Sequence, residues 1–116
     1  MRPGALDHER LDVYRCAIAF LVVAVRIGAR LGRGQAELRD QLQRASTSIP
    51  LNIAEASGKS SAADRARYHA IARGSALECG AIVDVLAVLG AAKGADIEEA
   101  KTLLARIVAM LSTMCR

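Results

Sequence analysis

Apolar residues recur every three or four positions along four segments of this chain, with polar residues between them. The segments span residues 7–31, 35–57, 61–89 and 96–115. Glycines punctuate the connections, at Gly32, Gly34, Gly58 and within the stretch GAAKGA at 90–95. No stretch alternates with a period of two. Because short connections make consecutive helices antiparallel neighbours, the pattern predicts one all-α domain over 1–116, an up-down-up-down antiparallel four-helix bundle.

The first predicted helix is apolar on two sides. One line is expected to face the core and consists of Tyr14, Ala17, Ile18, Leu21, Val25, Gly28 and Leu31. A second line lies on another face and consists of Val13, Phe20, Val23 and Ile27. Because a surface helix of a lone bundle normally keeps its far side polar, the second line predicts the interface of a homo-oligomer.

Pro50 lies in the middle of the second predicted helix, two positions before Asn52. Proline removes a helical hydrogen bond, and the three hydroxyl residues before it can bond to the backbone of such a turn. Asn52 and Glu78 fall on the inner lines of their helices, with Arg44 and Glu55 near by. Since buried polar groups are paired, these four residues predict an internal polar network between the second and third helices.

Local signals mark the starts of the third and fourth helices. Ser61 with Asp64 resembles a capping box, and Asp96 with Glu99 fits that motif fully. Gly74 lacks a side chain within the third helix, which predicts a close crossing of two helices there.

Three stretches together resemble a known family. They are LDVYRCAIAF (11–20), LRDQLQRASTSIPLNIAEASGK (38–59) and ARYHAIARGSALECGA (66–81). The chain is similar to the four-helix-bundle proteins encoded in intervening sequences of bacterial 23S ribosomal RNA, a family that also includes proteins like the accessory variability determinant of diversity-generating retroelements. The resemblance implies a homopentameric ring. It also implies, from the retroelement relatives, nucleic-acid binding through a basic surface alongside a reverse transcriptase.

Basic residues outnumber acidic ones by 16 to 12, for a net charge of +4. Candidate nucleic-acid contacts form two groups. Arg15, Arg26, Arg30 and Arg33 share about 60° of arc on the first helix. Lys59, Arg65, Arg67 and Arg73 surround the start of the third helix. Phosphate contacts would sum over several copies of the chain. The alternative is a solvated face, or arginines that pair with acids such as Asp12 across a subunit boundary.

The chain lacks the residue patterns of common catalytic and metal sites. It has two histidines, His8 and His69, and no Glu-x-x-His pair for a di-iron bundle. His69 is expected at the surface or at an interface. The hydroxyl residues have no histidine and acid spaced as in a triad, and the phosphate-binding GxxxxGK[ST] motif is absent. We therefore expect no enzyme activity, no cofactor and no metal.

The cysteines and the apolar run indicate a cytoplasmic protein. Cys16, Cys79 and Cys115 lie far apart in apolar patterns, as buried thiols in a reducing compartment do. The run CAIAFLVVAV at 16–25 is half the length of a membrane span. No membrane association is expected.

Two functions follow. The first is a non-catalytic homo-oligomeric scaffold or accessory protein that binds RNA or DNA, or a nucleic-acid enzyme such as a reverse transcriptase. The alternative is a protein–protein interaction module with no nucleic-acid role.

Overall fold

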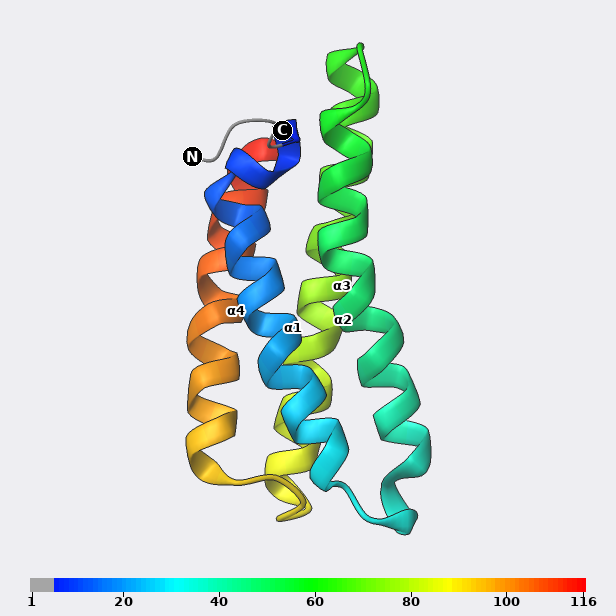
Figure 1. The fold of residues 1–116 in the computed structure, drawn as a ribbon, viewed down its shortest axis with the longest axis vertical. Helices are drawn as coiled ribbons and strands as arrows, with labels where there is room; N and C mark the ends of the chain where they lie inside the picture. The colour runs from blue at the N-terminus through cyan, green and yellow to red at the C-terminus, as the bar shows by residue number, and fades with distance from the viewer. Residues whose placement is uncertain (1–5) are drawn as a thin grey trace.

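The computed structural model describes residues 6–116, which form four α-helices and two short 3₁₀ turns (Figure 1). The helices are α1 (Asp12–Arg30), α2 (Ala36–Ser57), α3 (Ala62–Val88) and α4 (Gly94–Met114), and the turns are η1 (Asp7–Arg10) and η2 (Arg33–Gln35). The described residues include no strand. The predicted all-α class with four helices is confirmed.

The helices pack in a way compatible with a bundle. α2 and α4 each pack against both α1 and α3, whereas α1 and α3 make no close backbone contact with each other in the described chain, and neither do α2 and α4. Figure 1 shows the α1–α2 and α3–α4 connections at one end of the molecule. The α2–α3 connection lies at the other end and extends past α1 and α4.

The helix ends follow local backbone chemistry. α1 begins later than expected because Leu11 is extended, with φ −79° and ψ 131°, and separates η1 from α1. Ser61 caps α3 as predicted, since its side chain accepts a hydrogen bond from the Asp64 N–H at 3.0 Å. The predicted cap at Asp96 is wrong. α4 begins at Gly94, and its N-cap residue, Lys93, makes no side-chain capping bond.

Gly90 ends α3 with a positive φ of 65°, the left-handed conformation that glycine adopts without strain. The N–H groups of Gly90 and Ala91 donate to the carbonyls of Ala87 and Leu86, at 3.1 and 2.9 Å. These bonds satisfy carbonyls that the end of the helix would leave free.

The core contradicts the predicted oligomer interface. Val13, Phe20, Val23 and Ile27 are at most 2% exposed within the single chain. They pack into one apolar cluster with residues of the other three helices, so they cannot contact a second copy. The outward apolar residues of α1 are Ile18, Val22 and Val25. Two of these, Ile18 and Val25, were expected in the core.

Pro50 is buried inside α2. Hydroxyl groups bond to the backbone in the preceding turn, as expected: Thr47 Oγ1 donates to the carbonyls of Gln43 and Arg44 at 2.9 and 3.0 Å. Ser46 Oγ also donates to the Gln43 carbonyl, at 3.3 Å. Such bonds back to a carbonyl three or four residues earlier often bend a helix.

Candidate functional site

The polar contact between α2 and α3 is smaller than predicted. Asn52 Nδ2 donates to the carbonyl and to Oγ of Ser48, at 2.9 and 3.0 Å. Ser75 Oγ of α3 then donates to Ser48 Oγ at 2.8 Å. Asn52 is therefore satisfied within its own helix, and the bridge to α3 is a pair of hydroxyls.

The charged residues that were predicted in this internal network do not belong to it. Arg44, Glu55 and Glu78 are all exposed. Glu55 pairs with Lys59 at 3.3 Å, one turn away on the surface. The close helix crossing predicted at Gly74 does not occur within the described chain, because no atom of another helix lies within 4 Å of the place that a Cβ atom would take.

Two arginines of α1 bind acids of α4. Arg26 Nη1 lies 3.2 Å from Asp96 Oδ1 and 3.2 Å from Glu99 Oε1, and Arg30 Nη1 lies 2.8 Å from Asp96 Oδ2. The Asp96 side chain is only 8% exposed. The hydrogen bond that Arg26 donates to Glu99, and then the one that it donates to Asp96, raise the pKa of Arg26 above its ordinary value. We name Arg26, Arg30, Asp96 and Glu99 the α1–α4 clamp.

The predicted basic group of the first helix is therefore divided. Arg26 and Arg30 are neutralised by the clamp. Arg15 binds Asp12 at 3.3 Å and donates to the carbonyls of Glu9 and Arg10, so it ties η1 to α1. Arg33 lies in η2, past the end of α1, and is exposed. Three of the four arginines pair with acids, but these acids belong to the same chain and not, as the alternative expected, to a neighbouring subunit.

The second basic group lies partly at the tip of the α2–α3 hairpin. Lys59 Nζ lies 5.1 Å and Arg67 Cζ 4.5 Å from the ring centroid of Tyr68, distances typical of cation–π contacts. Arg65 donates to the carbonyls of Lys59 and Ser60, at 3.1 and 2.9 Å, and so holds the turn.

Arg73 lies apart from the tip. Its Nε donates to Ser112 Oγ of α4 at 2.7 Å. The structure thus places Lys59, Arg65 and Arg67 together and assigns Arg73 to helix packing. We name Lys59, Arg65, Arg67 and Tyr68 the basic tip.

His69 is buried, so its predicted surface or interface position is wrong. Nδ1 lies 3.3 Å from the carbonyl oxygen of Met114, and Nε2 is buried with no hydrogen-bond partner. Among residues 6–116, no three His, Cys, Asp or Glu side chains lie together in an arrangement that would hold a metal ion.

All three cysteines are free thiols, and Cys16 and Cys79 are buried. Burial, together with the nearby charge of Glu78, raises the pKa of the Cys79 thiol to about 12. Since the thiolate is the reactive form of cysteine, Cys79 stays protonated and unreactive at neutral pH.

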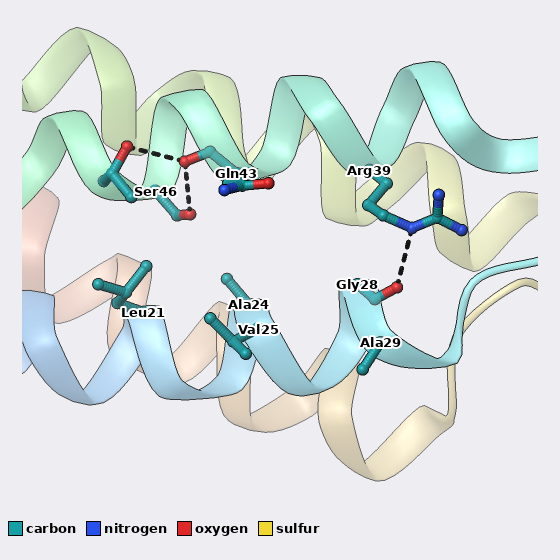
Figure 2. Close-up of a pocket in the computed structure, with 9 residues that line it drawn as sticks. Leu21, Ala24, Val25, Gly28, Ala29, Arg39, Gln43 and Ser46 are labelled. Carbon is teal, nitrogen blue, oxygen red and sulfur yellow. Dashed lines mark hydrogen bonds between the residues drawn. The ribbon is translucent and has the colours of Figure 1, made fainter.

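A groove of about 490 Å³ runs between α1 and α2 (Figure 2). Leu21, Ala24, Val25 and Ala29 of α1 form its apolar wall, and Arg39, Gln43, Ser46 and Thr47 of α2 line the other side. Arg39 Nε donates to the Gly28 carbonyl at 3.1 Å, and its Nη2 donates to the Leu31 carbonyl at 2.7 Å. Arg39 thereby closes one end of the groove and caps α1.

Exposed apolar side chains cover outward faces of α1 and α3. On α1, Ile18, Val22 and Val25 are 37%, 56% and 62% exposed. On α3, the exposed apolar residues are Ile71, Leu77, Val85 and Val88. The two apolar faces of α1 were predicted from the sequence, but the face expected on the outside is the buried one. The α3 face was not predicted, although Ile71, Val85 and Val88 fall on one side of a helix.

Comparison with known proteins agrees with this architecture. A family model described as the 23S rRNA-intervening sequence protein matches residues 9–113. No curated protein matches the chain. Within residues 6–116, none of the helices has both the length and the apolar character required to cross a membrane. Four helices and a match over most of the sequence confirm the resemblance: the chain belongs to the 23S rRNA-intervening sequence protein family.

Proposed function

We propose that the chain is the protomer of a homo-oligomeric scaffold built from up-down-up-down antiparallel bundles, and that it has no catalytic role. The observation that carries the proposal is the outward face of α1, where Val22 and Val25 are more than half exposed in the single chain. Burying apolar area contributes about 25 cal/mol per Å². A second copy of the chain would remove this surface from water, and the family resemblance favours five copies.

Other features support a structural role in the cytoplasm. The buried Cys79 thiol is protonated at neutral pH, and the α1–α4 clamp uses its carboxylates to bind arginines. Free thiols at Cys16 and Cys115 are typical of a reducing compartment.

Light scattering coupled to size exclusion tests the proposal. A single chain has a mass of 12.3 kDa. We expect a larger mass that is a whole multiple of this value and stable on dilution through the micromolar range. A mass of one chain at every concentration would refute the scaffold and would leave the apolar faces to a different protein partner.

The basic tip favours a second function, binding to RNA or DNA. An aromatic ring flanked by two cations offers a base-stacking surface together with phosphate contacts. An oligomer would carry several copies of the tip, and their phosphate contacts would sum. Binding would therefore weaken steeply as the salt concentration rises. The reverse transcriptase that the family resemblance implies would then be a partner recruited alongside the nucleic acid.

Fluorescence anisotropy with labelled single-stranded RNA and DNA tests the basic tip. The double variant Lys59→Ala/Arg67→Ala is expected to weaken binding at least tenfold at low salt. The matched control is Lys93→Ala/Arg106→Ala, which removes two exposed cations away from the tip. Equal weakening by both variants, or no binding by the wild type at low salt, would refute a nucleic-acid role for the tip.

A further inference from the structure

We infer that the exposed faces of α1 and α3 are the two halves of one interface, so that α1 of each copy docks on α3 of the next. This inference rests on the proposed homo-oligomer and specifies its contact. The α1 stripe consists of Ile18, Val22, Val25 and Ala29. The α3 stripe consists of Ile71, Gly74, Glu78, Ala81, Val85 and Val88.

Both stripes have the spacing of helices that pair along their length. Their members alternate between three and four residues apart, which keeps one seam facing a partner helix. All of these residues are exposed in the single chain. Because α1 and α3 make no close contact within the described chain, one copy cannot bury either stripe with the other.

Contacts with α4 show which levels of α1 and α3 correspond. Arg26 of α1 binds Glu99, and Asp84 of α3 binds Lys101 at 2.7 Å. Glu99 and Lys101 are two residues apart, or about 3 Å along the helix axis. At the other end, residues 11–13 at the start of α1 border Met110 and Met114 in one pocket, and Arg73 binds Ser112. α1 and α3 therefore run in the same direction, with Val25 level with Val85.

Copies related by rotation about an axis along the bundle are not shifted along that axis, so levels within one copy carry over to its neighbour. Val25 then meets Val85 of the next copy, Val22 meets Ala81, and Ala29 meets Val88. Two of these pairs match a larger side chain with an alanine, as close helix packing requires. Val88, which is 87% exposed, reaches the level of the groove beside Ala29.

This arrangement explains why a glycine occupies position 74 of α3. Glycine within a helix is less stable than alanine by about 0.5–1 kcal/mol, and inside the chain nothing approaches its missing side chain within 4 Å. Gly74 lies on the α3 stripe, one residue from the level of Arg15. Its bare backbone allows the α1 helix of the next copy to approach closely.

The charges of the two faces are complementary. Glu78 lies in the centre of the α3 stripe as an exposed carboxylate, and it forms no ion pair within residues 6–116. By the same levels Glu78 lies opposite Ile18, and the level of Arg15 is about 4.5 Å away, within the reach of an arginine side chain. The present partner of Arg15, Asp12, is 80% exposed, and exposed pairs of this kind contribute little. Its bonds to the carbonyls of Glu9 and Arg10 are exposed as well, so in the assembly Arg15 exchanges these partners for Glu78 of the neighbouring copy.

An interface between two different surfaces is heterologous. Each copy offers an unused α1 stripe on one side and an unused α3 stripe on the other, so association repeats until a ring closes. A dimer formed by two α1 stripes would instead be isologous and would stop at two copies. The two arrangements differ in how stripe variants behave when they are mixed.

The test uses one substitution on each stripe and light scattering. Val25→Asp and Val85→Asp should each give a mass of 12.3 kDa. Mixed in equal amounts, they should form a dimer of twice that mass, because the intact α1 stripe of one variant docks on the intact α3 stripe of the other. Leu51→Asp is the matched control, since Leu51 is 65% exposed on α2 and belongs to neither stripe.

A charge exchange tests the pairing of Arg15 with Glu78. Arg15→Glu and Glu78→Arg should each weaken assembly at least tenfold, and the double variant should restore most of it. Gly74→Trp provides a variant that the single chain accommodates, because the space there is open. It should dissociate the oligomer and leave the helical circular dichroism unchanged.

The measurements distinguish a failure of the proposed scaffold from a failure of the α1–α3 interface. A wild-type monomer would refute the proposed scaffold before any substitution is made. A wild-type oligomer that survives Val85→Asp, or stripe variants that stay monomeric when mixed, would overturn the α1–α3 interface and leave the scaffold standing. Dissociation by Leu51→Asp would also overturn it.

Discussion

Asp96→Asn should destabilise the protein more than any other single change of an ion-paired acid described above. Asp96 is nearly buried and accepts from two arginines of α1, at 3.2 and 2.8 Å. Hydrogen bonds to charged groups contribute about 1.5–3 kcal/mol each. The arginine side chains are 39% and 46% exposed, and asparagine keeps one acceptor, so we expect a loss of about 2 kcal/mol in total.

Thermal melting followed by circular dichroism measures this loss. Unfolding entropy is about 2.1 cal/mol/K per residue near 60 °C, so a loss of about 2 kcal/mol in this chain lowers Tm by about 8 °C. The matched control is Asp84→Asn. Asp84 also pairs across two helices, with Lys101 at 2.7 Å, but both side chains are about half exposed. Such a pair contributes about 0–1 kcal/mol.

Equal shifts for the two variants would refute the argument that burial makes the α1–α4 clamp strong. Added salt gives a second check. Because screening acts mainly on exposed pairs, salt should reduce the effect of Asp84→Asn more than that of Asp96→Asn. Asp96→Asn also frees Arg26 and Arg30. If it strengthened RNA binding at low salt, the predicted basic face of the first helix would exist in a masked form.

Phe20→Ala should lower the free energy of unfolding by about 3–5 kcal/mol in urea titrations, because Phe20 is fully buried; Leu51→Ala, at an exposed site, is the control and should change it by less than about 0.5 kcal/mol. Asn52→Ala should lower the free energy of unfolding by about 1 kcal/mol through its lost bonds to Ser48, and a melt identical to wild type would contradict that contribution. The Cys79 thiol, with its pKa raised to about 12, should react with Ellman's reagent at neutral pH only after unfolding. Since the unfolded thiol ionises near pH 9 and the folded one near 12, its contribution to stability is complete below pH 9. Above pH 9 this contribution to the free energy of unfolding should decline by about 1.4 kcal/mol per pH unit. If the free energy of unfolding of the wild type declined no more steeply than that of Cys79→Ala, the burial argument would be contradicted.

Helix number and most helix ends were predictable because they depend on local chemistry. The Ser61 cap and the glycine-rich connection after α3 act within a few residues, and the structure confirms both. The start of α1 was not predictable, because the extended Leu11 lies inside an apolar pattern that continues across it.

The orientation of α1 could not be read from spacing. Its two lines are both apolar, and packing against α2 and α4 turns Phe20 inward and Val25 outward. Spacing along one helix gives its faces but not the direction in which each face points. The clamp was missed for a related reason: Asp96 lies 66 residues from Arg30, and its place in the first turn of α4 looks like a cap.

The candidate site was predictable in part. Lys59, Arg65 and Arg67 were expected together, and they meet at the tip because they flank one tight turn. Glu78 was expected inside, yet the neighbouring Ser75 and Cys79 face inward and leave Glu78 on the outer side. A rotation of about 100° per residue separates these positions.

The central claim is that α1 of one copy contacts α3 of another, and disulfide cross-linking tests it most directly. Val25→Cys and Val85→Cys are placed in one chain that carries Cys115→Ala, so that the remaining native thiols are the buried Cys16 and Cys79. Disulfides form only where Cα atoms come within about 7 Å. Mild oxidation and denaturing electrophoresis should give a ladder that ends at the ring size, whereas each cysteine alone should give monomer. Strong dimers from either single-cysteine chain, or no ladder from the double-cysteine chain although the wild type is oligomeric, would contradict the account.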